Sequence, residues 1–162
     1  MTLPQIDVVQ DGSDEDCNPE LMNMIEAAVK HAVVTAKLSY DENAELSVLL
    51  SDDETLRNLN AQWRNIDKPT NVLSFPGEDL EPGDVGGMFL GDIVVSMETT
   101  RREAKLENKS FDDHFTHLII HGFLHLFGYD HETEDQAFQM EGLETEILAR
   151  LGIPDPYESD TR

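Results

Sequence analysis

The chain has 162 residues, of which 34 are acidic and 11 basic, and its formal net charge at pH 7 is −23. This length suits one domain with a single core, so we expect one domain over residues 1–162. The only cysteine, Cys17, excludes an intramolecular disulfide. The sequence begins without a signal-peptide pattern and has no run of about 18 apolar residues, so we expect a cytoplasmic protein with no membrane partner.

Strand-like and helix-like segments alternate along the chain without repeats. We expect strands at residues 6–10, 45–50, 71–75 and 90–96, and helices at 19–38, 51–63, 97–107, from about 110 to an end at Gly128, and at 134–151. Ser51 and Glu54 have the spacing of a capping box at the second helix, and Ser110 can cap the fourth. Residues 76–87 are rich in glycine and proline and are expected to form a loop.

These segments predict an α/β (α+β) fold, in which a mixed sheet of about four strands packs with about five helices in two main layers. The order of the strands does not follow from the sequence. We expect residues 1–18 and 152–162 to be flexible at the ends of the domain.

Charge is distributed unevenly along the chain. Acidic residues crowd the first third, and the middle contains Arg57, Arg64, Lys68, Arg101, Arg102, Lys105 and Lys109. Composition alone argues against nucleic-acid binding, since neutralisation of phosphates supplies much of the affinity for nucleic acids. Two interpretations of the middle segment remain open: a local basic patch, or a solvated helix face on which acids alternate with bases.

Three histidines have the spacing of metal ligands. His121 and His125 are four residues apart, so on a helix they lie on one face, and His131 follows six residues later. Gly128 can adopt a left-handed conformation that ends the helix and turns His131 toward the other two. Three protein ligands and an open fourth position are typical of catalytic zinc, so the pattern predicts one Zn2+ per chain on a zincin-like metal helix, with other transition metals as alternatives.

Metzincin proteases share this spacing, but they have a glutamate as general base where this chain has Gly122. The departure weakens a peptidase interpretation at its central residue. Asp130 and Glu132 flank the third histidine and are candidates to accept its second ring proton, although ordinary surface acids fit equally well.

Three further side chains follow helical spacing near the motif. We expect His114 to cap a buried face and Met140 to pack in the core. For His117, a supporting contact to the site and a structural role both remain open.

Three blocks of sequence resemble the YbeY family of bacterial metal-dependent endoribonucleases, also called rRNA maturation factors. They are HGFLHLFGYDH at residues 121–131, WRNIDKPTNVLSFP at 63–76 and LGDIVVS at 90–96. The blocks occur in the order that the family has, and the resemblance covers roughly residues 45 to 151. The histidine block is highly specific, and the other two support it.

The resemblance implies single-strand-specific cleavage of RNA in 16S ribosomal RNA 3′-end maturation and ribosome quality control, with the small ribosomal subunit as a partner. It also assigns Arg64 to the family's functionally important arginine, whose planar guanidinium suits a phosphodiester. Without the family resemblance, Arg64 would be interpreted as a cation at a helix C-terminus. Two alternatives remain: a zincin-like metallopeptidase, and a non-catalytic ribosome-assembly factor with a structural metal.

Overall fold

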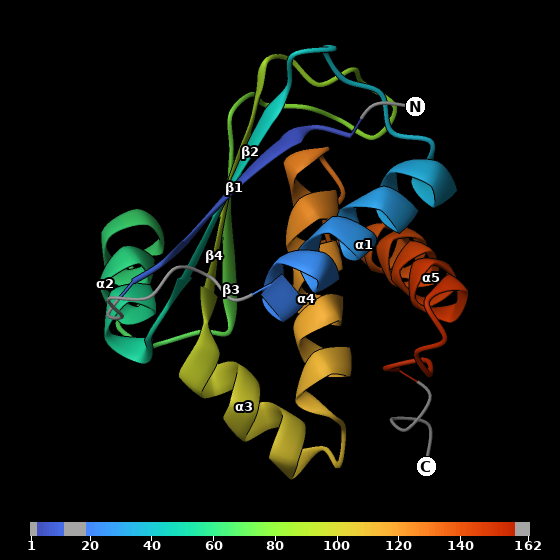
Figure 1. Ribbon diagram of the computed structural model, residues 1–162. Helices are drawn as coiled ribbons and strands as arrows, with labels where there is room; N and C mark the ends of the chain where they lie inside the picture. The colour runs from blue at the N-terminus through green and yellow to red at the C-terminus, as the bar shows by residue number, and fades with distance from the viewer. Residues whose placement is uncertain (1–2, 12–18, 158–162) are drawn as a thin grey trace.

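The computed structural model describes residues 3–11 and 19–157 (Figure 1). In these residues the elements are β1 (Gln5–Gln10), α1 (Pro19–Ala36), β2 (Glu45–Ser51), α2 (Asp53–Arg64), β3 (Val72–Pro76), β4 (Phe89–Ser96), α3 (Met97–Leu106), α4 (Phe111–Leu126) and α5 (Glu134–Arg150). Most bounds differ from the predicted ones by one or two residues. Cys17 lies outside the described residues. Residues 1–2, 12–18 and 158–162, which belong to the ends expected to be flexible, also lie outside them.

The four strands form one mixed sheet with the order β1-β2-β4-β3. β1, β2 and β4 run parallel, and β3 is antiparallel to β4 at one edge. The predicted mixed α/β sheet is confirmed. The central strands β2 and β4 are rich in valine, isoleucine and leucine because both of their faces are largely covered.

Helices cover the two faces of the sheet unequally. α1 and α4 pack on one face, and α5 packs against them on the side away from the sheet, which builds the main core (Figure 1). α2 lies on the opposite face, where Leu56 packs against Leu73 and Val94 in a second, smaller cluster. The prediction of two main layers was therefore wrong, because the strands also carry apolar residues on the face that α2 covers. In the described part of the chain, no helix is both long and apolar enough to span a bilayer.

The start of α2 differs from the predicted capping box. Ser51 is the last residue of β2, where it pairs with Ser96 in the ladder to β4. Asp52 is the N-cap instead, and its carboxylate accepts the backbone N–H of Thr55 at 2.9 Å. The ladder holds Ser51 in a strand, so the capping role moves to the next side chain that can accept a hydrogen bond.

The central helix α4 begins as predicted, since the Ser110 hydroxyl accepts the Asp113 backbone N–H at 3.1 Å. It contacts the sheet at Gly122, whose carbonyl oxygen accepts the Ser74 hydroxyl of β3 at 2.9 Å. A Cβ at this glycine would lie 3.0 Å from the Ile93 Cγ2 atom and 3.1 Å from the Ser74 Oγ atom. The missing side chain therefore lets α4 lie directly on β3 and β4.

This contact predicts how substitutions at Gly122 change stability. Gly122→Glu should lower the free energy of unfolding by at least about 2 kcal/mol, because the longer side chain would overpack a buried position and place a carboxylate against the sheet. Gly122→Ala should change it by no more than about 1 kcal/mol, since improved helix propensity offsets the tighter contact. Urea unfolding followed by circular dichroism measures both, and a glutamate variant as stable as the parent would contradict the packing.

Candidate active site

α4 places two of the three motif histidines side by side. His121 and His125 lie on one face of the helix, one turn apart, and their Nε2 atoms are 3.0 Å from each other. The ring of His131 lies beyond the end of the helix, with its centroid 5.4 Å from that of His121 and 5.1 Å from that of His125. One ligand atom from each of the three histidines can be chosen so that all lie within 4.8 Å of one another.

Gly128 makes the turn that returns His131 to the other two rings. Its φ is +93°, a conformation that side chains disfavour, and a Cβ at this position would overlap the carbonyl oxygen of Leu80. The predicted turn is thus present, and the loop after β3 adds a second reason for glycine. This turn converts a helical pair of imidazoles into a cluster of three.

Hydrogen bonds fix the orientation of both helical imidazoles. The Nδ1–H of His121 donates to the Glu144 carboxylate at 2.8 Å, and the Nδ1–H of His125 donates to the Tyr129 carbonyl oxygen at 2.8 Å. Burial and the neighbouring His121 lower the pKa of His125 to about 4, although the Tyr129 carbonyl opposes this shift. His125 is therefore neutral at pH 7 with its lone pair on Nε2, and His121 presents the same atom in its neutral form.

Two facing lone pairs repel each other unless a cation lies between them. A tetrahedral zinc ion bound at about 2.0–2.1 Å would hold two nitrogens about 3.3 Å apart, which is close to the observed 3.0 Å. The acidic residues Glu78, Asp79, Asp130 and Glu132 line the same cavity and would further favour a cation. The donor set and its surroundings thus fit a transition metal.

Glu144 of α5 orients His121, the first histidine of the cluster, through a hydrogen bond to its Nδ1–H. Its side chain is fully buried, and its carboxylate accepts hydrogen bonds from His121, His117 and the Tyr157 hydroxyl. Burial opposes ionisation, but the hydrogen bonds from His117 and His121 outweigh it and lower the pKa of Glu144 to about 2. Glu144 was not among the residues that the sequence pattern indicated. The available signal was its spacing. Glu144 comes four residues after Met140 and three before Ile147, both buried, and this spacing places a carboxylate on the apolar stripe of α5.

The other predicted neighbours have varied roles. His117 belongs to the support of the site through its 2.6 Å contact with Glu144, whereas His114 is buried and contacts Glu103 at 2.8 Å. Met140 is buried in the core, as expected. Asp130 accepts the backbone N–H of His131 at 2.8 Å and not its ring proton.

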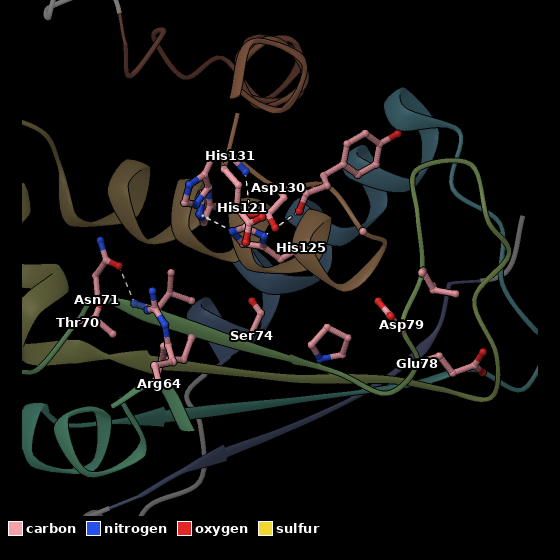
Figure 2. A pocket seen from close by; sticks show the side chains of 17 residues that line it. Arg64, Thr70, Asn71, Ser74, Glu78, Asp79, His121, His125, Asp130 and His131 are labelled. Atoms are coloured by element: carbon pink, nitrogen blue, oxygen red, sulfur yellow. Dashed lines mark hydrogen bonds between the residues drawn. The ribbon is translucent and has the colours of Figure 1, made fainter. Parts of the chain in front are cut away.

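A cavity of about 630 Å3 lies between the histidines and the edge strand β3. Figure 2 shows His121, His125 and His131 on one side and Arg64 across from them, with Ser74 of β3 between. Arg64 therefore lines the same cavity as the histidines, although it is 57 residues away from the nearest of them in the sequence.

The end of α2 positions Arg64. The helix ends at Asn65, which has a left-handed φ of +58°, and the Arg64 guanidinium donates to the buried Asn60 side chain at 3.4 Å. Asn60 is held in turn by donating to the Lys68 carbonyl oxygen at 2.9 Å. Within the described residues, no carboxylate forms an ion pair with Arg64, so its charge remains available to the cavity.

Several other basic residues of the middle segment are neutralised by acids. Arg57 pairs with Asp67 at 2.7 Å, Arg102 with Asp53 at 3.1 Å and Lys109 with Glu107 at 2.8 Å. These pairs favour the solvated, charge-alternating interpretation over a continuous basic patch. Arg64 differs from them because it lies beside the histidine cluster.

Comparison with known proteins agrees with this arrangement. The family model described as Endoribonuclease YbeY matches residues 8–152. An Endoribonuclease YbeY of Sinorhizobium fredii is 47% identical over 167 residues, covering 100% of this chain and 96% of the relative. One of Bradyrhizobium diazoefficiens is 57% identical over 141 residues, covering 82% of this chain and 75% of the relative.

The fold also has a counterpart among solved structures. A Thermotoga maritima protein determined in solution superposes with a TM-score of 0.56 at 23% identity, covering 93% of this chain and 92% of that one. This likeness concerns the fold alone, whereas the family model and the sequence relatives extend over most of the chain. The chain therefore belongs to the Endoribonuclease YbeY family, a family of nucleases.

Proposed function

We propose that this nuclease is a metal-dependent endoribonuclease specific for single-stranded RNA, acting in the cytoplasm in 16S ribosomal RNA 3′-end maturation and ribosome quality control. The small ribosomal subunit is its proposed partner. The observation that carries the proposal is the shared cavity, which combines three convergent imidazoles with the unpaired guanidinium of Arg64 in a chain of this family.

His121, His125 and His131 are the proposed ligands of one Zn2+. When bound, such an ion lowers the pKa of a water molecule and attracts the negative charge of a phosphate. The protein's own contribution is to keep His121 and His125 in the tautomer that leaves Nε2 free, through the Glu144 carboxylate and the Tyr129 carbonyl.

Arg64 is proposed to bind the scissile phosphate. Its guanidinium can donate two parallel hydrogen bonds to phosphate oxygens and offset the charge that develops during cleavage. The hydrogen bond to Asn60 limits the directions that the side chain takes, and Arg64 lines the same cavity as the histidines.

Two alternatives are less well supported by the site. A zincin-like peptidase needs a carboxylate beside the first ligand, and Gly122 both lacks one and packs against the sheet. A ribosome-assembly factor with a structural metal would hold its ion in a closed site, whereas the histidines here line an open cavity. Parallel assays with a peptide and with single-stranded RNA discriminate the first alternative.

The ligand assignment predicts the metal content of histidine variants. His125→Ala should lower bound zinc from about one ion per chain to below a tenth of that, since two imidazoles seldom retain zinc against buffer. His31→Ala, which changes a histidine of α1 outside the cluster, should leave the content unchanged. Elemental analysis of dialysed protein measures both variants, and full occupancy in His125→Ala would refute the assignment.

The support from α5 predicts a separate effect on affinity. Glu144→Gln should weaken zinc binding by about 10- to 100-fold, because an amide no longer gives the His121 Nδ1–H a charged acceptor. Glu146→Gln changes an exposed residue of the same helix and serves as the control. Competition with a chelator reports the affinity, and circular dichroism verifies the fold. Equal affinity in the two variants would show that Glu144 has only a packing role.

Arg64 is tested by a substitution that keeps its charge. Arg64→Lys should reduce cleavage of single-stranded RNA by about tenfold or more while zinc content and stability stay constant, because lysine cannot donate the bidentate pair. Arg150→Lys, in the last turn of α5, is the matched control. If Arg64 serves only as a helix-end cation, lysine replaces it equally well and the two variants cleave RNA at the same rate.

A further inference from the structure

An apolar groove lies on the far side of β3 from the histidine cavity. It has a volume of about 680 Å3 and is bordered by Val9, Leu49, Leu59, Trp63, Phe75 and Asp92, among others, from α2 and all four strands. We call it the Trp63 groove. It occupies the part of the outer sheet face that α2 leaves open.

Trp63 is the most unusual side chain of this groove. It is the only tryptophan of the chain, and 64% of its surface is exposed. Its ring and that of Phe75 form a T-shaped pair with centroids 6.1 Å apart, so Phe75 packs against the indole. Because most of the indole stays exposed beside this contact, another flat ring can stack on it.

The groove adjoins the proposed active site at the edge strand β3. Pro76 borders both the histidine cavity and the groove. Along β3, Ser74 faces the cavity and the next residue, Phe75, faces the groove, since successive strand residues point to opposite faces. On α2, Trp63 in the groove directly precedes Arg64 in the cavity. A strand of RNA whose phosphate contacts Arg64 can therefore continue around the edge of the sheet to Trp63.

Charge determines what the groove can bind. The chain has a net charge of −23, and Asp92 borders the groove. The protein as a whole and the groove itself therefore lack the positive charge that usually attracts the phosphates of nucleic acid. Nucleobases are uncharged, and every base has a flat face that can stack on an aromatic side chain without contact to a phosphate. Base stacking is thus the contribution to RNA affinity that this surface can supply.

From these observations we propose that the Trp63 groove binds nucleobases of the RNA strand next to the scissile phosphodiester, with a base stacked on Trp63. This inference rests on the proposed RNA substrate. It adds a subsite away from the metal ligands and gives the enzyme a means of holding RNA despite its charge.

The single tryptophan permits a direct test of binding. Single-stranded oligoribonucleotides with cleavage-resistant phosphorothioate linkages should quench Trp63 fluorescence, and abasic oligomers of the same length and charge should not. Binding that is detected by anisotropy of a labelled oligonucleotide, yet leaves the emission of Trp63 unchanged, would overturn the inference. A change of emission with protein concentration in the absence of RNA would also overturn it, since a second copy of the chain would then occupy the groove.

Kinetics provide the second part of the test. Trp63→Ala should raise KM for a long single-stranded RNA by about tenfold, with kcat nearly unchanged, while Trp63→Phe keeps a stacking ring and restores most of the loss. Phe138→Ala removes an exposed aromatic ring of α5 outside the groove and should have no effect. A dinucleotide too short to reach the groove should be cleaved equally by Trp63→Ala and the parent.

The outcomes separate this inference from the proposed function. If the parent protein cleaves RNA and Trp63→Ala has the parent's KM on long substrates, the stacking subsite is wrong and the nuclease assignment stands. If the zinc-loaded parent neither binds nor cleaves single-stranded RNA, the proposed substrate itself is wrong, and the inference that rests on it falls too.

Discussion

The close fit of α4 against the sheet at Gly122 determines where the groups of the candidate active site lie. His121 directly precedes this glycine, so the distance between helix and sheet also sets the distance between the imidazoles and β3. The Ser74 hydroxyl fixes that approach by donating to the helix backbone. A side chain longer than that of alanine at Gly122 would push α4 outward and widen the space between the histidines and Arg64. The position that carries the general base in metzincins is used here for packing.

The second constraint is the burial of one charge. A carboxylate inside a core is costly unless donors surround it, and His117, His121 and Tyr157 supply those donors to Glu144. Two of them belong to α4 and the third lies near the end of the described chain. The orientation of the first histidine thus depends on three segments that meet only in the folded protein.

This dependence on tertiary contacts explains which features the sequence could predict. The histidine cluster was predictable because helical spacing and a glycine turn are local properties. The helices and strands were also located within a few residues. Strand order, the separate layer formed by α2 and the role of Glu144 depend on contacts distant in sequence, so periodicity alone did not reveal them. Arg64 was a candidate only through the family resemblance, because a helix-end arginine has a common structural explanation.

The acidity of the chain also bears on the kind of RNA that the site can use. Among the described residues that line the cavity, Arg64 is the one lysine or arginine, so Arg64 and a bound cation would be the main attractions for phosphate there. A double helix keeps its base faces inside its own stack and offers a protein mainly phosphates and groove edges. A single strand exposes base faces that an indole can contact. With so little positive charge available, the proposed combination of one arginine, one metal ion and one stacking surface favours single strands over duplexes. The preference for single-stranded over double-stranded RNA would then follow from the small number of phosphate contacts.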